Sequence, residues 1–227
     1  QRRMVRPAFG PVAALSAGSA VDLSHFLTWY NQPGTPKLEA KGEYDAATQT
    51  YRLSFKQSLK AHSKYLNLTA VPIPIALALF NAQTGEQYAL QSDDLVENGV
   101  QDGVYLFDSD AASIEFTGIT AQPVASLLRN FSAPVNLVFD YSNDDLAFLI
   151  QHESNGFNQW QATQTLLERI LLEDHKADAY IQAIKNTLPE LVQKDPLLAS
   201  RLFDVPSENY LASRIDQDYE PELIREK

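Results

Sequence analysis

The spacing of apolar residues changes near residue 143 and divides the chain into two parts. Before that point, apolar and polar residues alternate over short stretches, and turn residues recur at short intervals. After it, prolines become rarer and apolar residues fall three and four positions apart. A period of two is typical of a strand with one buried face, and a period of 3.6 is typical of an amphipathic helix. The pattern therefore predicts a β domain followed by a helical one.

Several segments of the first part have the periodicity of strands. Residues 51–56 alternate between apolar and polar side chains, and residues 69–80 form a longer apolar stretch that contains Pro72 and Pro74. Because proline donates no hydrogen bond to a sheet ladder, these prolines place the stretch at a sheet edge or at the start of a strand. About seven short strands separated by turns indicate a sandwich of two antiparallel sheets. After the turn at residues 81–86, further strands are predicted at residues 87–90, 103–107, 113–116 and 133–141.

The second part begins with a helix start signal. Ser142 lies three residues before Asp145 and ahead of an apolar run, which resembles a capping box with Asp in place of Glu. The third helix is expected to end near Pro189, and Pro196 and Pro206 each lie near the start of a further short helix. Short helices joined by short loops indicate an antiparallel array. The first three apolar stripes are Leu146, Leu149 and Ile150; Phe157, Trp160, Gln164, Leu167 and Leu171; and Tyr180, Ile184 and Leu188.

Charge and cysteine content exclude several classes of function. The chain carries a net charge of −11, most of it after residue 143, whereas a surface that follows nucleic-acid phosphates needs the opposite sign. With no cysteine, disulfides, thiolate zinc sites and cysteine nucleophiles are excluded, and a reducing compartment such as the cytoplasm is expected. No apolar run reaches the roughly 18 residues that a membrane-spanning helix needs. We therefore expect no nucleic-acid partner and no membrane partner.

A search for metal sites finds one incomplete motif. The H-E-x-x-H pattern places two histidines and a glutamate on one face of a helix. His152 and Glu153 begin that pattern, but Gly156 stands where the second histidine is needed. We interpret the pair as ordinary surface chemistry at a helix end, and His25 as a half-buried packing residue beside Phe26 and Trp29. The four histidines are His25, His62, His152 and His175.

Other catalytic patterns are not found in the sequence. There is no G-x-S-x-G nucleophile elbow and no glycine-rich phosphate loop. Acidic clusters at residues 93–94, 108–110 and 216–220 lack the spacing of a calcium loop, so we interpret them as solvated turns and helix starts. Asn67 and Asn130 match the N-glycosylation pattern, but no signal peptide is recognised in residues 1–20. The sequence therefore predicts no catalytic, cofactor-binding or metal-binding residue.

Four motifs in register carry a resemblance to a known family. They are VDLSHFLTWYNQPGTP at residues 21–36, FSAPV at residues 131–135, YSNDDL at residues 141–146 and FNQW at residues 157–160. Their order and spacing resemble those of the bacterial aminopeptidase N family, zinc-dependent gluzincin enzymes that remove N-terminal residues from peptides. In that family, a helix closing the catalytic domain precedes a β-sandwich, and a helical array follows it. The resemblance covers residues 21–227.

The resemblance implies an architecture without an activity. The family's H-E-x-x-H helix, its further glutamate ligand, its catalytic tyrosine and its G-A-M-E-N-like loop all lie upstream of the W-Y-x-Q-x-G-T-P segment, and none occurs here. The resemblance therefore places zinc in the parent family and no cofactor in this chain, which we expect to be inactive alone. The implied fold class is α+β in two parts, an immunoglobulin-like antiparallel β-sandwich followed by an antiparallel helical array.

These inferences give an expected domain organisation and two hypotheses. We expect a weakly ordered lead-in at residues 1–20, a helix at residues 21–34 that would close a missing catalytic domain, a sandwich at residues 35–142 and a truncated helical domain at residues 143–227. The first hypothesis is a non-catalytic central fragment that acts as a structural spacer between the remaining domains of an aminopeptidase. The alternative is an interaction module that self-associates or complements a separate catalytic chain. A peptide-binding or sugar-binding sandwich rests on fold analogy alone.

Overall fold

The computed structural model describes residues 16, 18, 24–60, 68–90, 100–101, 103–173 and 176–214. The chain divides into two compact units. The first consists of Gln1–Ile75, Gln91–Gly118 and Ser132–Phe139, and the second of Ala76–Leu90, Ile119–Phe131 and Asp140–Lys227. The boundary between these units passes through a strand of the sandwich, between Ile75 and Ala76.

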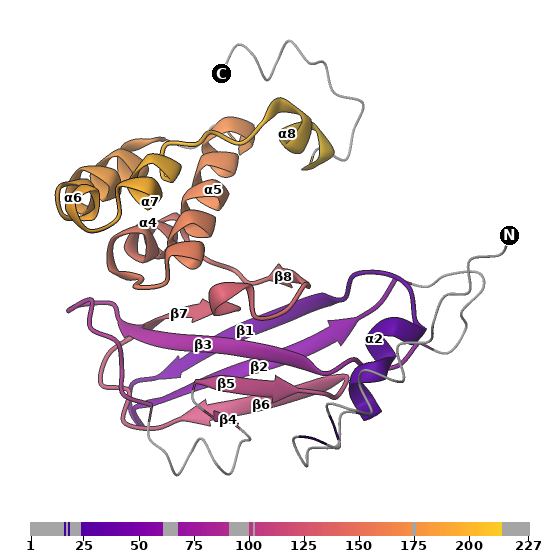
Figure 1. Cartoon of the computed structure of the whole chain (residues 1–227). Coiled ribbons are helices and arrows are strands. Elements are labelled where there is room, and N and C mark those ends of the chain that lie inside the picture. The colour runs from indigo at the N-terminus through magenta and orange to yellow at the C-terminus, as the bar shows by residue number, and fades with distance from the viewer. Residues whose placement is uncertain are drawn as a thin grey trace, which may run out of the picture. The chain divides into compact units, whose positions relative to one another are not determined.

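The first unit begins with a short helical segment, η1 (Ser24–Leu27) followed by α2 (Thr28–Asn31) (Figure 1). The indole Nε1 of Trp29 donates a 2.8 Å hydrogen bond to the carbonyl oxygen of Pro72, and Gln32 exchanges two hydrogen bonds with the backbone of Thr69. His25 is exposed, with Nε2 3.2 Å from the carbonyl oxygen of Ala70, so the prediction of a half-buried packing residue is wrong. Hydrogen bonds to a neighbouring segment, and not apolar burial, hold this segment in place.

One sheet has the strand order β6-β2-β1-β8 and lies in the first unit. Strands β1 (Lys37–Asp45) and β2 (Thr50–Ser58) form an antiparallel hairpin, and β6 (Ala111–Phe116) pairs antiparallel with β2. The predicted alternation of β2 is confirmed, because its apolar residues are buried between exposed or half-buried polar ones. The edge strand β8 (Asn136–Val138) is shorter than predicted and pairs parallel with β1.

The other sheet has the order β4-β5-β3-β7 and contains β4 (Val100–Gln101), β5 (Val104–Phe107), β3 (Ile73–Asn81) and β7 (Pro123–Leu127). In the first unit the sheets meet where the ring of Phe55 on β2 lies 5.7 and 5.9 Å from the rings of Tyr105 and Phe107 on β5. Strand β3 begins at Ile73, as the two prolines predicted. Residues 87–90 do not form the predicted strand, and Gln87 makes only an isolated bridge to Phe80.

The second unit contains the helices α4 (Asn143–His152), α5 (Gly156–Glu173), α6 (Asp178–Lys194), α7 (Pro196–Arg201) and α8 (Glu208–Arg214). The capping box is confirmed, because Ser142 Oγ accepts from the backbone N–H of Asp145 at 3.0 Å and Asp145 Oδ2 accepts from that of Ser142 at 2.9 Å. Pro189 does not end the third helix as predicted and lies inside α6. Pro189 has no N–H to donate to the carbonyl oxygen of Lys185. Both residues are exposed, so water can donate to that oxygen instead. Within the described chain, no helix combines the length and apolarity needed to cross a membrane.

Strands and helices share one core in the second unit. Buried residues of β3, β7 and helices α4–α7 pack in one cluster, with Phe80 on β3, Val124 on β7 and Leu146 on α4 among its members. The ring of Phe80 also lies 6.3 Å from that of Phe148 on α4 in an edge-to-face arrangement. The sandwich and the helical array are both confirmed. In this unit the helices pack directly against residues of the sheet.

Candidate functional site

Residues 128–131 connect β7 to the outer strand of the other sheet and have an unusual backbone. Leu128, Asn130 and Phe131 have φ angles of 55°, 57° and 54°. This left-handed region is disfavoured for residues with a Cβ, and it is rare for bulky ones such as Leu and Phe. Arg129–Phe131 form the short turn η2, inside which the backbone of Asn130 departs from helical geometry. Such strain persists only where the surroundings fix it.

A buried ion pair fixes this turn to the end of α4. Arg129 Nη2 lies 2.8 Å from Glu153 Oε1, and the two side chains are 20% and 0% exposed. The same Nη2 donates to Ser154 Oγ at 2.8 Å, and the backbone N–H of Asn155 donates to Glu153 Oε1 at 2.7 Å. Glu153 is also the C-cap of α4, its N–H donating to the carbonyl oxygen of Leu149. The α4–α5 connection is therefore organised around one carboxylate.

Three asparagines complete the connection. Asn155 Nδ2 donates to Asn130 Oδ1, and the backbone N–H of Asn130 donates to Asn155 Oδ1 at 3.3 Å. Asn155 Oδ1 also accepts from the N–H of Asn158 at 3.1 Å, which caps α5. Asn158 Nδ2 in turn donates to Ser126 Oγ and to the carbonyl oxygen of Leu127 on β7. We call the group Arg129, Asn130, Glu153, Asn155 and Asn158 the β7–α5 joint.

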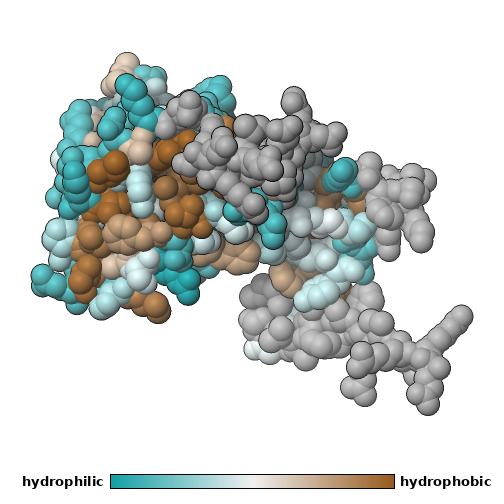
Figure 2. Space-filling model, turned by 90° about the horizontal axis from the view of Figure 1, so that it is seen from above, coloured by the Kyte–Doolittle hydropathy of each residue, from teal (hydrophilic) through white to brown (hydrophobic). Residues whose placement is uncertain are grey.

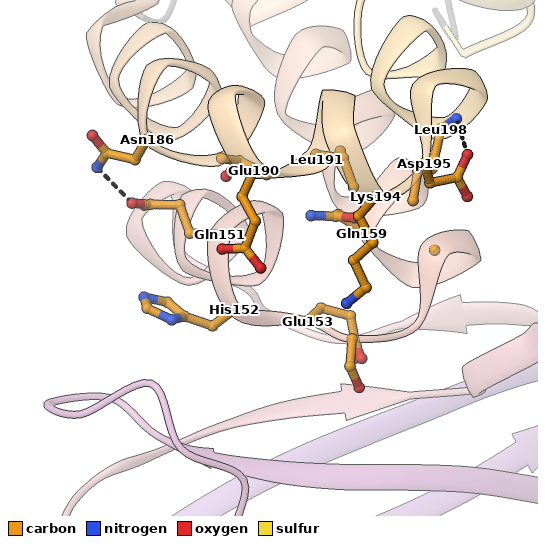
Figure 3. Close-up of a pocket in the computed structure, with 13 residues that line it drawn as sticks. Gln151, His152, Glu153, Gln159, Asn186, Glu190, Leu191, Lys194, Asp195 and Leu198 are labelled. Atoms are coloured by element: carbon orange, nitrogen blue, oxygen red, sulfur yellow. Dashed lines mark hydrogen bonds between the residues drawn. The ribbon is translucent and has the colours of Figure 1, made fainter.

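A pocket of about 430 Å³ lies beside the joint, between the end of α4, the second half of α6 and the start of α7 (Figure 3). Glu190 and Lys194 extend from α6 toward the end of α4 (Figure 3). Gln159 Nε2 donates to the carbonyl oxygen of Ile150 at 2.6 Å, and the hydroxyl of Thr187 donates to the same oxygen at 3.3 Å. These two lining groups bond to the last turn of α4, so they stabilise a helix end.

His152 also lines this pocket, where its ring packs against an aromatic ring. Its ring lies 4.4 Å from that of Phe148, and a Cβ at Gly85 would overlap it. Burial lowers its pKa below the ordinary value for histidine, so the ring is neutral at pH 7. Gly156 is the first residue of α5, so the H-E-x-x-H spacing would span two helices here. Among the described residues, no group of three or more His, Asp or Glu side chains could hold a metal ion.

The structure changes the interpretation of several residues singled out in the sequence. Glu153 is buried and ion-paired, so the prediction of ordinary surface chemistry is wrong for this residue. Arg129 was not predicted at all, although one arginine after the apolar run of residues 123–128 is a sequence signal that could have drawn attention to it. Asp108 and Asp110 lie in an exposed turn, as predicted. Asn67, His62, His175 and the acidic clusters at residues 93–94 and 216–220 lie outside the described residues.

Two family models match the chain in succession. Residues 34–140 match a domain of unknown function (DUF3458) with an Ig-like fold, and residues 143–227 match DUF3458_C, described as ARM repeats. Aminopeptidase N of Escherichia coli (strain K12) is 32% identical over 219 residues, which cover 90% of this chain and 24% of that protein. Aminopeptidase N of Caulobacter vibrioides is 32% identical over 212 residues, which cover 88% of this chain and 23% of that protein.

The chain belongs to the aminopeptidase N family. The resemblance seen in the four motifs is thereby confirmed, and it extends to solved structures. A crystal structure of Legionella pneumophila aminopeptidase A in complex with aspartic acid matches 95% of this chain and 23% of its own chain, with a TM-score of 0.74 and 25% sequence identity. The chain spans about a quarter or less of the length of the curated aminopeptidase N relatives that it matches.

Proposed function

We propose that this chain is a non-catalytic connecting part of an aminopeptidase N-type protein and acts as a structural spacer between a catalytic domain and a helical array. The observation that carries the proposal is the second unit, in which β3, β7 and the helices share one core and the β7–α5 joint bonds the sheet to the array. Such a core suits a part that holds others at a fixed separation. The domain limits near residues 34 and 142 belong to the same proposal.

Peptidase chemistry is assigned to the parent protein in this proposal. The resemblance places the family's zinc ligands and catalytic residues upstream of the W-Y-x-Q-x-G-T-P segment, and the motifs that carry them do not occur in these 227 residues. The lack of cysteine fits work in a reducing compartment, which we take to be the cytoplasm.

A direct assay tests the proposal. The purified chain is incubated with an alanine-anilide substrate, with and without added zinc, beside an equimolar full-length bacterial aminopeptidase N as the positive control. We expect no release of the anilide and no stoichiometric zinc by metal analysis. Turnover that depends on zinc co-purifying with the chain would overturn the proposal, and His152→Ala with Glu153→Gln would then be the first variants to assay.

A second candidate function, self-association, is favoured by exposed apolar side chains. Phe26 and Tyr30 are 41% and 62% exposed, with their rings 6.1 Å apart, and Leu197 on α7 is 70% exposed. Figure 2 shows apolar side chains gathered in patches on the visible face of the helical part. Exposed patches of this kind mark interaction sites. Sedimentation velocity tests this candidate. It is supported if the mass of the parent chain rises with concentration while the Leu197→Asp variant remains a monomer. It is excluded if the parent chain is a monomer at every concentration.

A further inference from the structure

Strain is concentrated in the turn that follows β7 and contacts the helices of the second unit. Leu128, Asn130 and Phe131 all lie in the left-handed region, within four consecutive residues. A chain segment of this sequence would rarely adopt that conformation by itself, because each Cβ approaches the following carbonyl oxygen. Contacts made elsewhere must therefore select it.

The α4–α5 connection and the first turn of α5 contact three of these residues. Arg129 pairs with Glu153, Asn130 bonds reciprocally with Asn155, and the ring of Phe131 lies 5.5 Å from that of Phe157 in an edge-to-face arrangement. Three successive residues of the turn are thus held from the same side. The strained turn and the helix connection therefore stabilise each other.

The ion pair at the centre is incompletely bonded. Arg129 Nε and Glu153 Oε2 belong to the same pair, yet both are buried without a hydrogen-bond partner, and so is Asn158 Oδ1. A side-on pair would use both oxygens and both nitrogens of the fork. Unpaired buried polar atoms oppose the closed state, and a buried pair contributes little net stability unless its remaining groups are satisfied. Few contacts therefore stabilise the joint, and two free-energy terms oppose them: the strain of the backbone and the desolvation of the unpaired polar atoms.

We propose that residues 128–131 form a strained latch whose closed state depends on the Arg129–Glu153 pair. When the pair is lost, the turn relaxes and the start of α5 separates from β7, while the β3–β7 ladder stays formed. The latch is a conformational device that sets how tightly helices are held to the sheet. It rests on the proposed connecting function and adds to it a point at which α5 can separate from β7.

Hydrogen exchange followed by mass spectrometry tests the latch in the full chain. In Glu153→Gln, which keeps the size of the side chain and removes its charge, we expect amides of residues 156–167 to exchange at least about 100-fold faster than in the parent chain. Amides of β3 (Ile73–Asn81) should keep their rates. The matched control is Asp204→Asn, which removes an exposed pair with Arg201 whose side chains are 62% and 48% exposed, and it should change neither set.

A second variant tests the strain itself. Asn130→Gly and Asn130→Ala both remove the side-chain bond to Asn155, but only Asn130→Gly removes the Cβ from a left-handed residue. Residues 156–167 should therefore open more slowly in Asn130→Gly than in Asn130→Ala, both alone and combined with Glu153→Gln. Gln49→Gly is the control, because Gln49 has a φ of 53° in the β1–β2 turn and should leave α5 unaffected. If Glu153→Gln fails to fold, the comparison of Asn130→Gly with Asn130→Ala decides, and equal or faster exchange of α5 in Asn130→Gly would overturn the proposal.

Other outcomes are equally decisive. Exchange that rises uniformly in β3, β7 and α5 of Glu153→Gln would show that the pair supports the whole fold and is no latch. Exchange no faster than in Asp204→Asn would show that the pair holds nothing. Hydrolysis of alanine-anilide by the parent chain would overturn the connecting function without altering these rates, so the two failures are distinguishable.

Discussion

At the scale of single residues, Gln57 shows how a buried polar side chain can fix a loop. Its side chain bonds to both the N–H and the carbonyl oxygen of Val71 and to the carbonyl oxygen of Ser109, at 2.9, 3.0 and 2.9 Å. Gln57 is 6% exposed and Val71 is 1% exposed, so solvent does not replace these bonds when they are lost. Buried backbone groups left without partners each cost about 1–3 kcal/mol.

We therefore expect Gln57→Met to lower the free energy of unfolding by about 2–4 kcal/mol, measured by urea denaturation. The control is Lys56→Met, at the exposed neighbouring position of β2, which should change it by less than about 0.5 kcal/mol. An equal, small effect of both substitutions would show that the amide is not needed to hold the segment around Val71.

At the scale of elements, patterns set by residues a few positions apart could be predicted, and contacts between polar residues far apart in the sequence could not. The alternation in β2 and the capping box before α4 were found because each follows from local chemistry. The five residues of β7 are all buried, and a short apolar run without alternation does not distinguish a strand from other buried segments. The joint was missed because its partners are polar and lie about 25 positions apart in the sequence.

The buried face of α5 shows the same limit. Of the predicted stripe only Leu167 is buried, because Asn158, Gln159 and Thr163 occupy buried positions on this face. Asn158 and Gln159 are buried because their amides bond to backbone of β7 and α4. Phe157 and Trp160 are instead half-buried. Counting apolar residues cannot identify a face that polar side chains help to form.

The corrected face of α5 makes a testable ranking. Leu166 is fully buried, so Leu166→Ala should cost about 2–5 kcal/mol, whereas Trp160→Ala, although it removes more atoms, should cost less than the roughly 3–5 kcal/mol of a core tryptophan and less than Leu166→Ala. Urea denaturation of both variants gives the comparison. A larger loss for Trp160→Ala would restore the face predicted from the sequence.

At the scale of the whole molecule, the two compact units share a strand. Ile73–Asn81 runs through both, with its first three residues in one unit and the remainder in the other. A strand cannot lose part of its ladder without exposing the backbone groups and side chains of the rest. We therefore expect the two units to unfold together, as a single cooperative transition.

The two tryptophans of the chain report on this directly, because Trp29 lies in the first unit and Trp160 in the second. Trp160→Phe leaves a probe of the first unit and Trp29→Phe a probe of the second, so fluorescence of each variant can be followed in urea beside circular dichroism of the same samples. Coincident fluorescence and dichroism curves in each variant are expected, whereas a Trp160 signal that changes at lower urea would show that the units are separately stable.

Adding Glu153→Gln to each variant should produce that separation. The transition reported by Trp160 should then move to lower urea, while the transition reported by Trp29 should follow that of the sheet. If the substitution instead moves both transitions equally, the β7–α5 joint contributes only to overall stability.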